Sequence, residues 1–328
     1  MAEEKGYDGK WLITLDYPSY GPFMTYADNR AYREQLWRAF ANRAYQDEYD
    51  NCDLIKTIIS LRDERAKLLG YDTHADFVLE RRMAKSPQTV MDFLGKLLET
   101  YKPSAEKELK DLQEFANSTG FDGDLKPWDV GYYSEKLKQK LFDFSSEDLR
   151  PYFQLDNVLE GVFTHFSKLF GLKFKQAENV PTWHEDVACY EVHDLNNDAF
   201  VGLLYADFYP RTGKKQGAWK TSYRDQGLHG GEIKQPIVAI VCNFTKPTKE
   251  TPSLLTFGEV TTLFHEMGHA IHALLSNVTY ASHSGTSVLW DFVELPSQVQ
   301  ENWAYKKETL DLFAAHYKTG EKIPEELI

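Results

Sequence analysis

The chain is poor in several features that would place it in a particular class of protein. It has only three cysteines, Cys52, Cys189 and Cys242, and they are far apart in the sequence. The last two lie in apolar segments, so we expect reduced core thiols and no disulfide framework. No apolar run approaches the roughly 18 residues that a membrane-spanning helix needs, and the mean hydropathy is −0.51. The sequence therefore predicts no membrane segment.

Positive charge is scarce as well. The 37 Lys and Arg residues stand against 50 Asp and Glu residues, which gives a formal net charge of −13. This balance disfavours nucleic acid or an anionic membrane surface as a partner. No charged-then-apolar leader opens the chain, so we expect a cytoplasmic location. The 328 residues are enough to bury a substantial core in one large or two medium domains.

The first half of the chain has apolar residues spaced three and four apart, which is typical of amphipathic helices. Gly70 and Gly171 stand where helix C-caps are expected. Helices are predicted at residues 28–45, 54–69, 75–83, 88–115, 134–142 and 157–170.

After Gly171 the pattern favours strands, because Val, Ile, Tyr and Phe become frequent and partly alternate. Strands are predicted at residues 172–175, 187–193, 199–208 and 237–244, with a hairpin turn at 196–198. The polar, glycine-containing residues 209–235 are predicted to form a flexible loop, with a substrate-contacting loop as the alternative. Pro236 suits an edge strand, so the strand after it either borders a peptide-binding cleft or is a fully paired core strand.

The pattern H-E-x-x-H at residues 265–269 is the strongest signal of chemistry in the chain. Residues four apart share a helix face, so His265 and His269 can bind one zinc ion. Glu266, one residue around, is placed to act as a general base. Thr256 and Glu259 form a capping box that predicts a helix start near residue 257.

A zinc peptidase site also needs a third protein ligand and an open position for water. A second helical stretch is predicted at roughly residues 289–313, and the polar loop 277–287 would return it alongside the first helix. Glu294 and Asp291 lie three residues apart on nearly one face of this stretch. Spacing alone leaves both open, as ligand or as a partner that orients a ligand.

Several segments resemble the thimet oligopeptidase family of zinc metallopeptidases, and especially its bacterial peptidyl-dipeptidases (dipeptidyl carboxypeptidases). These segments are residues 11–16, 207–211, 241–247, 264–272, 284–286 and 291–298. The resemblance implies one zinc ion held by His265, His269 and Glu294, with Glu266 as general base. It also implies a mainly α, zincin-like core with a small β-sheet insertion, part of a larger two-lobed helical fold with a deep cleft.

Within that fold we expect a helical region at 1–171, a small sheet and glycine-containing loop at 172–250, and zinc-binding helices at 251–328. Two departures from the family pattern stand out, namely Met267 in place of Phe and Leu289-Trp290 in place of a more polar pair. Family members are about twice as long, and their C-terminal region carries His and Tyr residues that resemble oxyanion stabilisers. We therefore expect this chain to be the central piece of a larger enzyme.

By resemblance, the expected substrates are short peptides, from which dipeptides are released at the C-terminus. An oligopeptide endopeptidase is the nearest alternative, and a fragment that binds zinc or peptide without turnover is another.

The other histidines and Glu301 are not predicted to be metal ligands or catalytic residues. His272 is too far from His265 to bind the same metal ion, so we expect it either to contact a metal ligand or to be a hydrogen-bonded core residue. Glu301, seven residues after Glu294 on one helical face, could orient a metal-binding histidine, but a solvated glutamate is preferred. His74 and His165 are expected to be structural, and His229 and His283 to be loop residues near the site.

Overall fold

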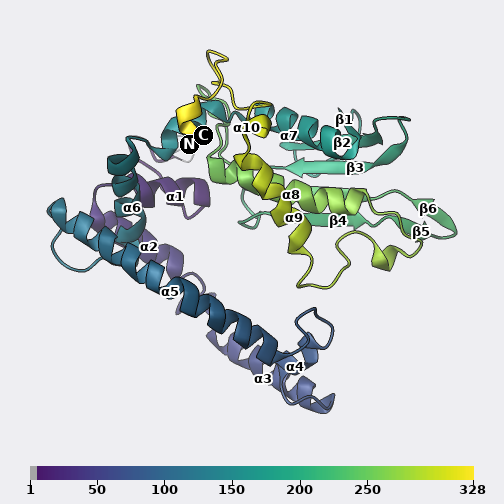
Figure 1. Ribbon diagram of the computed structural model, residues 1–328, viewed down its shortest axis with the longest axis horizontal. Helices are drawn as coiled ribbons and strands as arrows, with labels where there is room; N and C mark the ends of the chain where they lie inside the picture. Colours follow the sequence, from purple (N-terminus) through teal and green to yellow (C-terminus); the bar gives the residue numbers. More distant parts are fainter. Residues whose placement is uncertain (1–5) are drawn as a thin grey trace. The chain divides into compact units, whose positions relative to one another are not determined.

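The computed structural model describes residues 6–328, which fold into two compact units that divide between Ser145 and Ser146 (Figure 1). The chain is mainly helical with one small mixed sheet, as predicted. The three-part division expected at residues 171 and 250 follows changes of element type and stays a prediction. No helix among the described residues is long and apolar enough to cross a membrane.

The first unit is built from helices. They are α1 (Tyr17–Tyr26), α2 (Arg30–Ala41), α3 (Cys52–Leu68), α4 (His74–Leu79), α5 (Pro87–Ser118) and α6 (Pro127–Phe142). The predictions for α2 to α6 are confirmed to within several residues, whereas α1 has no predicted counterpart. Asp129 on α6 is buried and joins α2 to α6, because its carboxylate lies 2.8 Å from Arg30 and 3.0 Å from Arg33.

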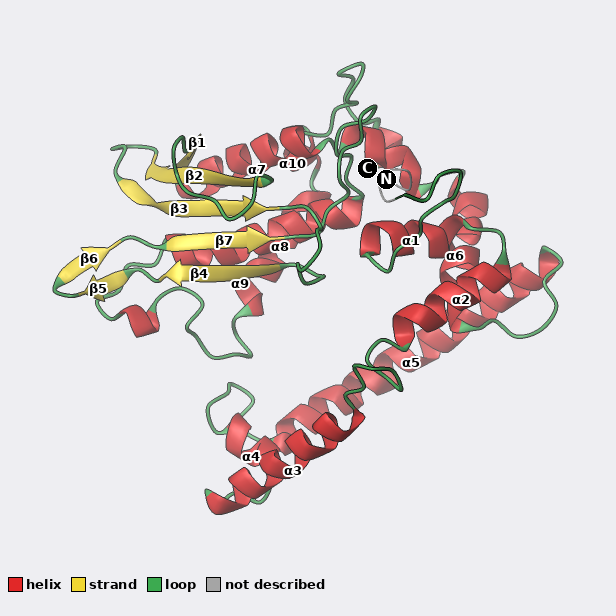
Figure 2. Ribbon diagram, turned by 180° about the vertical axis from the view of Figure 1, so that it is seen from behind, coloured by secondary structure: helices red, strands yellow, loops and turns green. Residues whose placement is uncertain are grey.

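The second unit places helices against a sheet. After a 3-10 turn at Ser146–Tyr152 come α7 (Leu155–Phe170), β1 (Leu172–Gln176), β2 (Val187–Asp194), β3 (Phe200–Asp207), β4 (Trp219–Arg224), the hairpin β5 (Gly227–His229) and β6 (Glu232–Lys234), β7 (Ile237–Val241) and α8 (Phe257–Leu274). Side chains of α7, α8 and one sheet face form a common core. In Figure 2 these two helices lie behind the strands of the sheet. Cys189 and Cys242 are buried and not disulfide-bonded, as predicted.

The order of strands in the sheet is β1-β2-β3-β7-β4 (Figure 2). β7 pairs with β3 in parallel and with β4 antiparallel, so both of its edges are paired. Of the two alternatives for residues 237–244, the edge strand was therefore wrong and the fully paired core strand is confirmed; β4 occupies that edge. The predicted flexible loop at 209–235 was also wrong in part, because it contains β4, β5 and β6.

The stretch predicted as one helix at 289–313 is instead three short pieces. They are α9 (Glu294–Glu301), a 3-10 turn at Asn302–Tyr305 and α10 (Lys307–Leu310). Pro296 lies in the first turn of α9, where its missing N–H has no helical partner to lose, so the helix begins there. Lys306 is extended, at φ −94° and ψ 131°, and interrupts the helical path after the 3-10 turn.

Candidate metal centre

The motif sits on a helix whose start is fixed by its cap. The Thr256 hydroxyl accepts a hydrogen bond from the Glu259 backbone N–H at 3.1 Å, and the Glu259 carboxylate accepts one from the Thr256 N–H at 2.7 Å. The capping box predicted from the sequence is confirmed. Glu259 also accepts a bond from the Thr245 N–H at 2.8 Å, which connects the start of α8 to the segment that follows β7.

α9 packs closely on α8 because Gly268 has no side chain. A Cβ atom at this position would lie 2.7 Å from the Cα atom of Ser297 and 3.2 Å from the carbonyl oxygen of Pro296. Such distances are shorter than a real Cβ contact allows, so a larger residue would push the two backbones apart. The close approach places Glu294, the first residue of α9, beside the motif histidines.

The structure brings together the three side chains that the sequence singled out. Glu294 Oε2 lies 3.1 Å from His265 Nε2 and 3.0 Å from His269 Nε2. One ligand atom from each residue lies within 4.8 Å of the others, and theirs is the one such group of metal-ligating side chains found in residues 6–328. Two imidazole nitrogens and a carboxylate oxygen are a donor set that suits zinc and leave a fourth position open.

Glu301 orients the His265 ring by bonding the ring nitrogen that does not face Glu294. The Glu301 Oε1 atom lies 2.7 Å from His265 Nδ1, so the ring donates its Nδ1 proton to the carboxylate. This tautomer leaves the Nε2 lone pair facing Glu294, which is the arrangement that a metal-binding histidine needs. The solvated Glu301 expected from the sequence was wrong, because its partner depends on how α9 packs on α8.

Glu266 lies beside these residues and is buried, with 4% of its surface exposed. The pKa of its carboxyl group is raised to about 7, chiefly by burial; His265 and Lys220 lower this pKa and the Glu294 carboxylate raises it. Its Oε2 atom has no hydrogen-bond partner among the described residues. Glu266, His265 and Glu301 line a hollow of about 490 Å³. The carboxyl group of Glu266 therefore borders the hollow, while its Oε2 atom is enclosed by protein.

Comparison with known proteins bears directly on this arrangement. Residues 23–328 match the model of the family described as peptidase family M3. The chain belongs to peptidase family M3. The whole chain is 42% identical to oligopeptidase A of Escherichia coli, of which it covers 49%. It is 36% identical, over 99% of its length, to dipeptidyl carboxypeptidase of the same organism, of which it covers 48%. Saccharolysin of Saccharomyces cerevisiae is 38% identical over 97% of the chain and is covered to 46%.

The chain thus spans about half the length of the curated M3 relatives it matches. The relatives named above include both oligopeptidases and a carboxypeptidase, so membership of the family does not decide between these two activities. The matched residues include α8, α9 and the sheet.

The remaining sequence candidates lie apart from the three-residue group. Asp291, the rival to Glu294, is not a member of it. His272 is on α8 and lines, with His283, a separate hollow of about 420 Å³. The ring of His229 bonds the Asp225 carbonyl oxygen at 2.9 Å. His165 is buried against the rings of Phe264 and Trp303, as expected of a structural histidine.

One residue near the site was missed entirely. Lys220 on β4 interacts electrostatically with Glu266, yet it lies in the segment that the sequence predicted to be a loop. The available signal was the alternation of Trp219, Thr221 and Tyr223 with Lys220 and Ser222, which fits a strand with one polar face.

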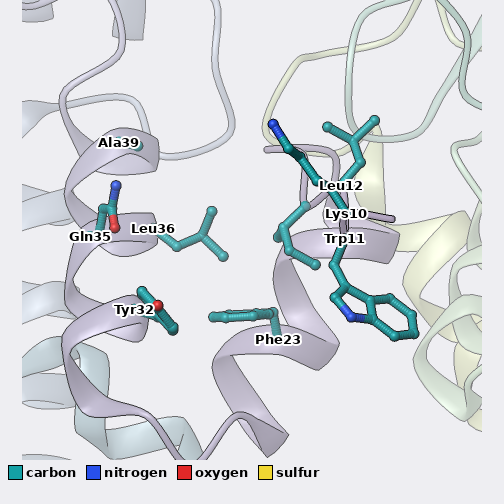
Figure 3. Close-up of a pocket in the computed structure, with 9 residues that line it drawn as sticks. Lys10, Trp11, Leu12, Phe23, Tyr32, Gln35, Leu36 and Ala39 are labelled. Atoms are coloured by element: carbon teal, nitrogen blue, oxygen red, sulfur yellow. The ribbon is translucent and has the colours of Figure 1, made fainter. Parts of the chain in front are cut away.

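Another hollow, in the first unit, differs from the one beside Glu266 in having no cluster of metal-ligating side chains among the described residues that line it. It measures about 850 Å³, and Phe23 of α1 and Leu36 of α2 point into it (Figure 3). Its lining is mostly apolar and includes none of the residues of the metal-ligating group.

Proposed function

We propose that the chain carries the metal-binding part of a zinc peptidase that hydrolyses short peptides. The observation that carries this proposal is the convergence of His265, His269 and Glu294, with Glu266 buried beside them. One zinc ion per chain would be held by the two Nε2 atoms and the Glu294 carboxylate. A cytoplasmic location stays part of the proposal; one Arabidopsis relative is named as cytosolic and another as chloroplastic and mitochondrial.

The side chains divide the chemistry between them. Zinc, when bound, acts as a Lewis acid toward a peptide carbonyl and makes a water molecule more acidic. Glu301 holds His265 in the tautomer that keeps its Nε2 lone pair available. Glu266, which lines the hollow, would take a proton from the attacking water on its carboxylate and pass it to the leaving amine.

The strand β4 offers a way to hold an extended peptide. It pairs only with β7 among the described strands, so its other edge is available to a peptide that adds to the sheet. The predicted role of an edge strand is therefore reassigned from residues 237–244 to β4. We retain the release of C-terminal dipeptides as the proposed activity. Endopeptidase action is the second candidate, and the 42% identity to oligopeptidase A favours it.

Metal analysis together with hydrolysis of a blocked peptide tests the proposal. We expect one zinc per chain, cleavage by the wild type, and loss of cleavage with retained zinc in Glu266→Gln. Cleavage of a peptide blocked at its C-terminus identifies the endopeptidase, whereas cleavage only of the free acid identifies the peptidyl-dipeptidase. Zinc without any cleavage would show that this chain is a binding fragment without turnover. Absence of zinc binding would refute the metal site itself.

A further inference from the structure

Lys220 occupies a defined place on the face of the sheet that α8 covers. In the pairing of β4 with β7 it lies opposite Ile240, which is fully buried in the core shared with α8. Directly opposite residues of an antiparallel pair project from the same face, so Lys220 projects toward α8. Ala218, two residues earlier, lines the hollow that contains Glu266.

The ammonium group is held between β4 and the loop that follows α8. Lys220 Nζ lies 2.7 Å from Thr286 Oγ1 and 3.0 Å from Ser222 Oγ. Thr286 follows Gly285, where a Cβ atom would lie 2.8 Å from the Cα atom of Ala273. Ala273 is one helical turn beyond His269, so the loop fixes the ammonium alongside the part of α8 that carries the motif.

Lys220 is half-buried, and its charge partners differ from those of two cations whose side chains are almost fully buried. Lys214, with 3% of its side chain exposed, lies 2.8 Å from the Asp207 carboxylate, and Arg33, with 1% exposed, lies 3.0 Å from Asp129. Lys220 has two neutral hydroxyls and, among residues 6–328, no carboxylate oxygen within 4 Å. Burial lowers the pKa of its ammonium group, while the more distant carboxylates of Asp225 and Glu266 act in the opposite direction.

An ammonium group has three N–H donors, and two of those on Lys220 are used. Removing a cation from water is costly unless an anion or further hydrogen bonds compensate for it. A carboxylate brought by a ligand would supply both the missing charge and the missing acceptor. Its approach along β4 would bring it beside Glu266, with which Lys220 already interacts electrostatically.

We propose that Lys220 is a specificity-determining residue that binds the C-terminal carboxylate of a peptide lying along β4. This inference rests on the proposed function and deepens it, because a cation at this place would select peptides that end near the scissile bond. The carboxylate of an acidic side chain has the same chemistry, so the test includes a probe for that source.

Binding of dipeptides to the zinc-loaded and the metal-free protein tests the proposal. The probes are alanyl-phenylalanine, its amide, and an amidated alanyl-glutamate, with dissociation constants measured by calorimetry. We expect the wild type to bind the acid roughly 10- to 100-fold more tightly than the amide, as a charge-assisted hydrogen bond implies. Lys220→Met should abolish that preference and Lys220→Arg should retain most of it. If the metal-free protein keeps the preference for the acid over the amide, the metal is not the group that binds the carboxylate.

Lys215→Met is the matched control, because Lys215 is an exposed lysine five residues before Lys220, and it should leave all dissociation constants unchanged. If Lys220→Met does not fold, as judged by thermal unfolding, Lys220→Gln replaces it. A preference for the glutamate probe that depends on Lys220 would overturn the assignment to the C-terminus. Equal affinity of the wild type for acid and amide, or a preference that survives in Lys220→Met, would overturn the role of Lys220. Failure to bind zinc would refute the proposed function and leave the metal-free comparison valid.

Discussion

Substitution of Gly268 by alanine tests the close packing that assembles the metal centre. The added Cβ atom would lie 2.7 Å from the Cα atom of Ser297. The Cα atom is part of the backbone of α9, and the Cβ atom is bonded directly to the backbone of α8. Rotation of a side chain cannot relieve this contact, so α9 must move away by about 0.7 Å or more to reach an ordinary contact of 3.4 Å. Glu294 lies one turn before Ser297 and moves with it.

The size of that displacement exceeds what a metal site tolerates, since metal–ligand distances hold to about 0.2 Å. We expect Gly268→Ala to weaken zinc binding by roughly 10- to 100-fold, although no ligand is changed, the loss typical of a disturbed ligand orientation. The forced contact should also lower the free energy of unfolding by about 1–3 kcal/mol. Helix propensity alone would give the opposite sign, because alanine is favoured over glycine by about 1 kcal/mol.

Competition with a chromogenic chelator measures the zinc affinity, and urea unfolding of the metal-free protein measures the stability. Gly258→Ala is the matched control on the same helix, because the nearest atom to its added Cβ is the hydroxyl oxygen of Thr256 at 3.9 Å. This control should keep its zinc affinity and match or exceed the wild-type stability. A zinc affinity of Gly268→Ala within twofold of the wild type would show that the close packing at Gly268 does not position Glu294.

Two further substitutions test the surroundings of the site. Glu301→Gln should weaken zinc binding by about 10- to 100-fold in the same chelator competition, because it removes the charged acceptor of the His265 Nδ1 proton; unchanged affinity would contradict that role. The Arg211 and Lys214 side chains help lower the pKa of buried Asp207 from 3.8 to about 2. Because the folded-state pKa is depressed, its contribution of about 2 kcal/mol is present above pH 4 and is lost as the pH falls toward 2. Asp207→Asn should therefore be less stable by at least about that amount at pH 7, and a difference in urea unfolding that does not shrink at pH 3 would contradict the assignment.

The part of the site that could be predicted from the sequence is the part set by local geometry. His265, Glu266 and His269 lie within five residues on one helix, so their relative placement follows from helical periodicity. The start of that helix follows equally from the capping pair of Thr256 and Glu259, whose mutual hydrogen bonds need no distant partner.

The rest depends on how distant segments pack, which periodicity does not determine. Glu294 and Asp291 are equivalent by spacing, and only the approach of α9 to α8 at Gly268 separates them in the structure. The same approach gives Glu301 its partner, so a residue that reads as a surface glutamate becomes a support for His265.

The misread segment at 209–235 has a topological explanation that also bears on function. β3 and β7 are adjacent and parallel, so the chain between them must cross over, and it does so by forming β4 beyond β7 and returning through β5 and β6. An edge strand needs less apolar sequence than a central one, and β4 is polar on the face that carries Lys220 and Ser222. That polarity obscured the strand in the sequence. It is also what places a cation, instead of another core residue, beside the helix that carries the metal motif.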